Sequence, residues 1–253
     1  MCGRYAITLP PEAVRLYFRY VEQPNFPPRY NIAPTQPIPI VRLERNRDQG
    51  AARHFALVRW GLLPSWVKDP RDFPLIINAR DDTILTKASF RASIRHRRCL
   101  VIADGFYEWR KTPLKTRAPK QPFLIRRVGG GPMAFAGLWE SWLGADGSEI
   151  DTACIVTTSA NGLVAAIHDR MPAILEPKDF DRWLDEREVT PHEAMSLIRP
   201  APDGALEMVE VGPAVGKVAN DGPQLQEPVA RPISGITARA RKPPATPDLF
   251  DED

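Results

Sequence analysis

The chain has 253 residues, of which 43% are hydrophobic and 26% charged, and its formal net charge is +3. This is the composition of a soluble globular protein, and the small net charge means that any anionic partner must bind a local basic patch. Three cysteines without a CxxC pair, and four histidines without metal-ligand spacing, argue against a disulfide framework and a structural metal site, so we expect no metal or other cofactor.

Strand-like apolar runs dominate the sequence, and several are apolar at consecutive positions, which is typical of strands covered on both faces. The predicted strands are Ile38–Leu43, Phe55–Trp60, Cys99–Ala103, Phe123–Val128, Met133–Trp139 and Ala153–Thr158. Helices are fewer, and two of them open with a proline and an acid close behind, which is a helix start signal. The predicted helices are Pro11–Tyr20, Ala88–Arg98, Gly162–Ile167, Pro177–Glu186 and Pro191–Ile198.

The pattern of elements is neither βαβ alternation nor a sequence repeat. We therefore predict a single α+β domain over residues 1–229, with a mostly antiparallel, barrel-like β core and peripheral helices. Residues 230–253 are rich in proline and charge, and we predict that they form a disordered tail. The absence of a signal peptide or a membrane-spanning run favours a cytoplasmic protein, which we expect to be a monomer.

The tail contains Leu249-Phe250, which is weakly similar to the short peptides that dock on bacterial sliding clamps. The segment lacks the glutamine that usually leads such peptides. A replication clamp is therefore one predicted partner, and a terminus that only aids solubility is the alternative.

Cys2 is the most informative residue, because removal of Met1 would leave a free α-amine beside its thiol. An α-amine has a pKa of about 7.7–8.0, so part of it is neutral and nucleophilic near pH 7. The amine and the thiol can both add to one aldehyde carbon, first as a Schiff base and then as a thiazolidine ring. The first residues alone fit a second interpretation equally well, in which Cys2 is a small buried residue at the start of a strand.

Three further clusters of functional residue types occur where loops are expected to follow or join the apolar runs. They are Trp60–Trp66 with Asn78-Ala79-Arg80, Asp104–Trp109, and His168–Pro172. Glu108 lies between two aromatic residues, which would partly desolvate it and favour proton transfer near neutral pH. Taken singly, each residue also fits a structural role: an ion-paired acid, a hydrogen-bonded histidine, a surface arginine or a core tryptophan.

Together, the motifs resemble the SOS response-associated peptidase family, whose members are abasic-site processing proteins. They follow one another in order, with a late segment at Val215–Asn220, and the resemblance extends from Met1 to about Val229. The six motifs are Met1–Tyr5, Arg29–Pro34, Trp60–Leu62, Ile77–Arg80, Gly105–Trp109 and Ile167–Pro172.

The resemblance implies that the protein binds single-stranded DNA and captures the aldehyde of an abasic site as a thiazolidine crosslink. It assigns the nucleophile to Cys2, proton transfer to Glu108, opening of the sugar to His168, and positioning of Cys2 and the lesion to Asn78. It also implies DNA contacts by Arg4, Trp66, Arg80 and Arg170, and a protein that works at the nucleoid. Some relatives have a second tryptophan where this chain has Val67, so the resemblance does not extend to stacking on a base at that position.

Two other functions stay open from the residues alone. An N-terminal-cysteine glutamine amidotransferase-like hydrolase would use the same thiol and amine, although it would not explain the clusters around Glu108 and His168. A non-covalent single-strand DNA-binding module would leave Cys2 with a structural role. The family's name also suggests proteolysis, of which we expect at most the removal of Met1.

Overall fold

A computed structural model describes residues 2–46, 48, 50–110 and 120–230 of the chain. The strands are β1 (Tyr5–Ile7), β2 (Arg29–Ile32), β3 (Pro37–Asn46), β4 (Gly50–Trp60), β5 (Asn78–Arg80), β6 (Arg98–Ala103), β7 (Gly105–Trp109), β8 (Pro122–Arg127), β9 (Met133–Leu143), β10 (Glu149–Ser159), β11 (Arg170–Pro172), β12 (Ile174–Leu175) and β13 (Leu206–Glu210). The helices are α1 (Pro11–Phe18), α2 (Ala88–Arg91), α3 (Ser93–His96), α4 (Gly162–Ala165), α5 (Phe180–Leu184) and α6 (Pro191–Met195). Short 3₁₀ turns are η1 (Pro70–Asp72), η2 (Pro177–Asp179), η3 (Pro213–Gly216) and η4 (Pro223–Gln226).

Some sequence predictions cannot be compared with this structure. The predicted tail, including Leu249-Phe250, lies outside the described residues apart from its first residue. Over the ranges that are described, no helix combines the length and apolar character needed to cross a bilayer.

Five strands close into a barrel, because β10 pairs with β4 on one side and with β9 on the other. The ring continues through antiparallel pairs from β4 to β3, from β3 to β6 and from β6 to β9. Only β4 and β5 run parallel to β10 among the strand pairs in the described residues. The prediction of an α+β fold with a mostly antiparallel, barrel-like core is therefore confirmed.

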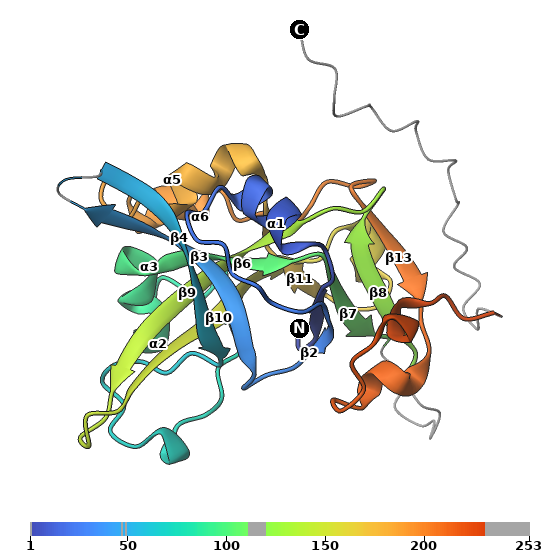
Figure 1. Cartoon of the computed structure of the whole chain (residues 1–253), viewed down its shortest axis with the longest axis horizontal. Helices are drawn as coiled ribbons and strands as arrows, with labels where there is room; N and C mark the ends of the chain where they lie inside the picture. The colour runs from blue at the N-terminus through green and yellow to red at the C-terminus, as the bar shows by residue number, and fades with distance from the viewer. Residues whose placement is uncertain (1, 47, 49, 111–119, 231–253) are drawn as a thin grey trace, which may run out of the picture.

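A second sheet, in the order β13-β8-β7-β1-β2, lies beside the barrel and carries the start of the chain (Figure 1). Tyr5 of β1 joins the two sheets, because its ring packs edge to face on Trp60 at 5.2 Å and on Phe135 at 6.0 Å. All three residues belong to one hydrophobic core that includes residues of both sheets. The N-terminal strand is consequently held against the barrel wall.

The six predicted strands are confirmed, and each lies within or almost within an observed strand. The Asp104–Trp109 cluster, however, was expected in a loop and instead forms β7. The strand forms because it has partners on both sides, β1 and β8, and because Phe106 is fully buried in the core. Glu108 is thus presented by a central strand of the sheet.

The predicted helix Ala88–Arg98 is wrong in its extent, since the chain forms two short helices and then enters β6 at Arg98. Arg98 is fully buried, and its guanidinium donates to the carbonyl oxygens of Ile94, Trp183, Asp185 and Val189. These bonds satisfy a charged group inside the protein. The helix α3 ends at His96, and Arg98 pairs with Leu138 of β9 as the first residue of β6.

The barrel wall is closely packed at Gly137 of β9. A Cβ atom there would lie 2.8 Å from Cys99 Sγ, 2.8 Å from Val101 Cγ2 and 3.3 Å from the carbonyl oxygen of Cys154. We predict that Gly137→Ala lowers the free energy of unfolding by about 1–3 kcal/mol through overpacking. Chemical denaturation would measure this.

Gly212→Ala is the matched control, because its φ is −65° and an added Cβ meets no atom within 4 Å. We expect it to be neutral or slightly stabilising. Equal stability of the two variants would contradict the packing argument.

Candidate active site

Cys2 and Glu108 are brought together by the pairing of β1 with β7. Tyr5 lies opposite Phe106, and the backbone N–H of Tyr107 donates to the carbonyl oxygen of Arg4 at 2.9 Å. Continuing this antiparallel register places Glu108 opposite Gly3, next to Cys2. Glu108 is only 5% exposed, so the expected desolvation of this acid is present.

The thiol of Cys2 is fully buried, and its Sγ lies 3.8 Å from the carbonyl oxygen of Arg4, to which it donates. Burial raises the pKa of the Cys2 thiol well above its usual value, and the negative charge of Glu108 raises it further. The thiol therefore stays protonated at neutral pH. A reaction at this residue must begin at another atom or remove the thiol proton as the sulfur attacks.

Asn78 holds Cys2 from the barrel side. It begins β5, which runs parallel to β10 with Asn78 opposite Ile155. Its Nδ2 donates to the carbonyl oxygen of Cys2 at 2.9 Å, which joins two residues 76 positions apart. Its Oδ1 is buried and accepts no hydrogen bond from the described residues, so it remains available as an acceptor.

His168 lies in the turn between α4 and β11, on the other side of β10 from β5. Its Nδ1 is 3.0 Å from the backbone nitrogen of Arg170 and 3.1 Å from the backbone oxygen of the same residue. The ring can therefore accept from the first atom when neutral or donate to the second when protonated. The carboxylate of Asp169 lies 3.1 Å from the same nitrogen.

Two of the predicted DNA-binding arginines bind inside the protein. Arg170 is 8% exposed, pairs with Asp81 at 2.6 Å, and donates to the side-chain and backbone oxygens of Thr157. Arg4 donates to Asn31 Oδ1 at 2.8 Å and to the carbonyl oxygen of Val215 at 2.7 Å. Both residues hold the site together in this structure, and their phosphate contacts stay predictions.

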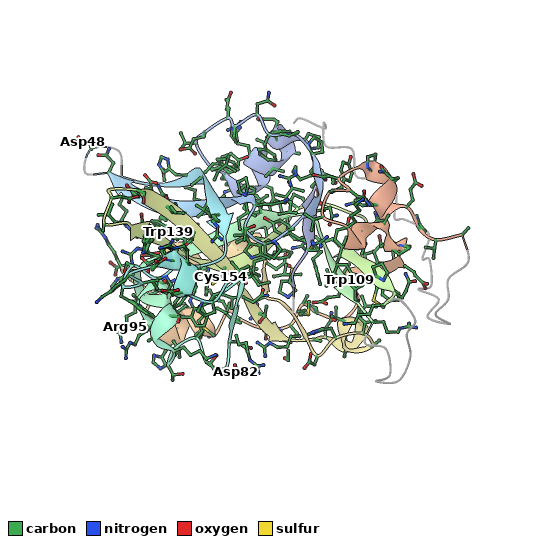
Figure 2. The ribbon with its side chains drawn as sticks, turned by 90° about the horizontal axis from the view of Figure 1, so that it is seen from below. Asp48, Asp82, Arg95, Trp109, Trp139 and Cys154 are labelled. Carbon is green, nitrogen blue, oxygen red and sulfur yellow. The ribbon has the colours of Figure 1, made fainter. Side chains whose placement is uncertain are left out.

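The other two predicted DNA-binding residues are accessible. Trp66 is 58% exposed and rests edge to face on Phe73 at a centroid distance of 5.5 Å. The side chain of Arg80 is 47% exposed and pairs with Asp82, which lies at the edge of the molecule in Figure 2. Their exposure fits the contacts expected of them.

Several residues of the site escaped the sequence analysis. Asn31 is fully buried and donates to the carbonyl oxygens of Val215, Lys217 and Asn220, which fastens the late segment to β2. Its place inside the Arg29–Pro34 motif was the available signal. Asp81, the partner of Arg170, directly follows Arg80 in the sequence, but nothing in the sequence pattern separates it from a surface acid.

In the ranges covered by the structure, no three His, Cys, Asp or Glu side chains gather in a way that could hold a metal ion. The site so far consists of a buried thiol, a buried acid beside it, an amide bound to the same residue, and a histidine across β10.

Comparison with known proteins relates the whole domain to one family. The family model described as SOS response associated peptidase (SRAP) matches residues 1–218. The abasic site processing protein YoqW of Bacillus subtilis is 34% identical over 230 residues, covering 90% of this chain and 99% of that protein. The abasic site processing protein HMCES of Gallus gallus is 32% identical over 268 residues, covering 90% of this chain and 78% of that protein.

Solved structures show the same fold. A crystal structure of a protein from Bacteroides thetaiotaomicron matches with a TM-score of 0.77 and 26% identity, covering 90% of this chain and all of that one. The crystal structure of a phage-related protein from Bordetella bronchiseptica matches with a TM-score of 0.65 and 31% identity, covering 83% of this chain and 94% of that one.

Proposed function

The chain belongs to the SOS response-associated peptidase family, and we propose that it captures abasic sites in single-stranded DNA covalently through Cys2. The names of its relatives YoqW and HMCES support an action on abasic sites. The observation that carries the covalent step is the juxtaposition at Cys2, where the buried acid Glu108 and the amide of Asn78 meet the start of the chain.

The reaction proposed begins with hydrolysis of the bond between Met1 and Cys2, which frees the α-amine. The neutral amine attacks C1′ of the ring-opened abasic sugar, and the resulting carbinolamine loses water to give an imine. The sulfur then adds to the imine carbon while the thiol proton passes to the imine nitrogen, which closes a thiazolidine. Removal of Met1 consumes one water molecule, the condensation with the sugar releases one, and no oxidant or reductant is consumed.

In this proposal the amine acts first, which is consistent with burial raising the pKa of the Cys2 thiol. A protonated, buried sulfur is a poor nucleophile, whereas the α-amine is partly neutral near pH 7. Once the imine has formed, its electrophilic carbon lies beside the sulfur. Because the imine nitrogen and the sulfur belong to the same residue, proximity favours addition of the sulfur to this carbon. Ring closure removes the imine, which is the species that would undergo β-elimination and break the DNA strand.

The surrounding residues have separate roles in this proposal. The carboxylate of Glu108 takes a proton from the attacking nitrogen and returns it to the hydroxyl of the carbinolamine, which leaves as water. It can do so because it lies next to residue 2 and is shielded from solvent. Asn78 holds the carbonyl of Cys2, and its Oδ1 can accept from the amine or from a sugar hydroxyl. His168 moves a proton during opening of the sugar ring. Removal of water by burial also protects the intermediates from hydrolysis.

Recognition of DNA is assigned to the exposed residues of the same region. Trp66 offers an aromatic face to a base, and Arg80 offers a cation to the backbone. The ion pair of Arg80 with Asp82 is exposed and therefore weak, so a phosphate can replace the carboxylate.

We predict that Trp66→Ala weakens non-covalent binding of a single-stranded oligonucleotide by about 5- to 150-fold, which corresponds to loss of one stacked base. Fluorescence anisotropy with a tetrahydrofuran lesion, which lacks an aldehyde, would measure it. Leu57→Ala is the control, since Leu57 is 59% exposed but lies on β4. Similar affinities for Trp66→Ala and the wild type would remove Trp66 from the interface.

The covalent function is tested by intact mass spectrometry before and after incubation with an abasic oligonucleotide. The expected result is a protein lacking Met1 that gains the oligonucleotide mass minus one water. An oligonucleotide with a tetrahydrofuran lesion should give no adduct. Glutaminase activity without adduct would instead favour the amidotransferase-like hydrolase, and binding without adduct would favour a non-covalent module.

A further inference from the structure

The hydroxyl of Tyr5 is a buried polar group without a partner. Tyr5 is fully buried, and its Oη forms no hydrogen bond with any residue that the structure describes. A hydroxyl that leaves water and finds no partner destabilises the folded state, so a buried atom of this kind needs an explanation. The reaction proposed above makes no use of it.

Tyr5 is connected to the residues that hold Cys2. Its ring packs edge to face on Trp60 at a centroid distance of 5.2 Å, and the indole Nε1 of Trp60 donates to the carbonyl oxygen of Ile77 at 3.0 Å. The next residue, Asn78, donates to the carbonyl oxygen of Cys2. Tyr5 also follows Cys2 by only three positions and belongs to the same core. The strand and the barrel wall therefore both place the phenol close to the site.

The charges around the Tyr5 hydroxyl agree with this placement. Burial raises the pKa of Tyr5 well above its usual value, and among the charged groups a negative charge on Cys2 has the largest effect on it. The hydroxyl therefore keeps its proton at neutral pH. It is a neutral hydrogen-bond donor near the Cys2 sulfur.

Closure of the thiazolidine changes the hydrogen bonding of that sulfur. Before the reaction, the thiol of Cys2 donates to the carbonyl oxygen of Arg4 at 3.8 Å. In the ring the sulfur is bonded to two carbon atoms and has no proton, so it can only accept a hydrogen bond. A nearby donor that has no other partner then gains one.

We propose that the hydroxyl of Tyr5 donates a hydrogen bond to the Cys2 sulfur in the closed thiazolidine and thereby favours the ring over the imine. This rests on the proposed function, because it takes Cys2 to form the ring. Tyr5 keeps its proton throughout and forms no covalent bond to the lesion. Its effect falls on the ratio of ring to imine, and hence on the persistence of the crosslink.

The experiment compares the wild type with Tyr5→Phe, which removes one oxygen atom and keeps the aromatic ring against Trp60. Each protein is incubated with an abasic oligonucleotide until the adduct yield is constant, and borohydride is then added briefly to part of the sample. Borohydride adds two hydrogen atoms to the imine and leaves the ring unchanged, so mass spectrometry of the crosslinked N-terminal peptide gives their ratio. We expect Tyr5→Phe to raise the ratio of imine to ring by about 2- to 10-fold, the effect of losing one hydrogen bond.

Tyr20→Phe is the matched control. Tyr20 is 2% exposed, belongs to the same core, and has an Oη that is likewise without a hydrogen bond to the described residues. The strongest charges acting on it are those of Arg15 and Glu12 rather than that of Cys2. Both variants remove an unpaired hydroxyl, so neither should unfold at a lower denaturant concentration than the wild type, and only Tyr5→Phe should change the ratio.

The stability of the crosslinked protein gives a second readout, because Tyr5 gains its partner only in the closed ring. The crosslink should raise the denaturation midpoint of the wild type by more than that of Tyr5→Phe. For Tyr20→Phe the increase should equal that of the wild type. A role of Tyr5 in core packing alone would change the uncrosslinked and crosslinked proteins equally.

An equal ratio of imine to ring in the wild type and Tyr5→Phe would overturn the proposal, and so would an equal increase in Tyr5→Phe and Tyr20→Phe. Both results leave the covalent function in place, because the adduct still forms. Absence of any adduct in the wild type rejects the covalent function and, with it, the role of Tyr5.

Discussion

Replacing Cys2 with alanine should abolish the adduct that survives denaturation. The variant keeps an α-amine and so can still form an imine, but it has no sulfur to close the ring. We therefore expect a change of product rather than loss of all reactivity: an adduct seen only after borohydride reduction, together with more cleaved DNA strand. Denaturing electrophoresis with and without borohydride would show both.

Cys154→Ala is the matched control for this experiment. Cys154 is also fully buried, lies in β10, and belongs to the same core as Cys2. Its replacement removes one buried sulfur atom from the core, as Cys2→Ala does, but leaves the thiol of Cys2 in place. The adduct yield should therefore equal that of the wild type. A heat-stable adduct of undiminished yield in Cys2→Ala would exclude the thiazolidine mechanism.

Glu108→Gln should slow formation of the crosslink by about 10²- to 10⁴-fold, the contribution typical of a positioned general acid or base. Glutamine keeps the shape of the side chain in β7 but cannot supply the proton. Single-turnover rates of adduct formation would measure the effect. Glu140→Gln is the control, since Glu140 is also buried but lies on β9, where it pairs with Arg97 and accepts from Ser93 of α3.

The same variant has a second consequence for Cys2. The charge of Glu108 is one cause of the raised pKa of the thiol, after burial itself. Removing the charge lowers that pKa, so the rate of thiol alkylation should begin to rise at a lower pH in Glu108→Gln than in the wild type. Coincident pH profiles would show that the two groups do not interact.

The sequence predicts long, buried elements well and short or polar ones poorly. Six apolar runs are confirmed as strands, because strands covered on both faces need consecutive apolar residues. β5, β11 and β12 have only two or three residues each, which is too few to recognise an alternation of apolar and polar side chains. β7 was not predicted, because it contains the acid Glu108. From the sequence alone, the strands that pair with β7 on both sides are unknown, and an acid is then more typical of a loop.

For the candidate site, the sequence could name residues but not their arrangement. Ordered motifs pointed to Cys2, Asn78, Glu108 and His168, and the structure links Asn78 and Glu108 to Cys2. Nothing local could show that the guanidinium of Arg170 would be buried against Asp81, or that Arg4 would bind residues more than 200 positions away. Both arrangements depend on sheet pairings between distant parts of the chain.

The bond between Arg4 and the carbonyl oxygen of Val215 also ties the beginning of the domain to its late segment. The segment around Cys2 and β1 has partners in residues 29–32, 105–109 and 215–216, and the last of these lie more than 200 positions along the chain. A chain truncated before residue 215 would therefore lose two of the carbonyl partners of Arg4, two residues after Cys2.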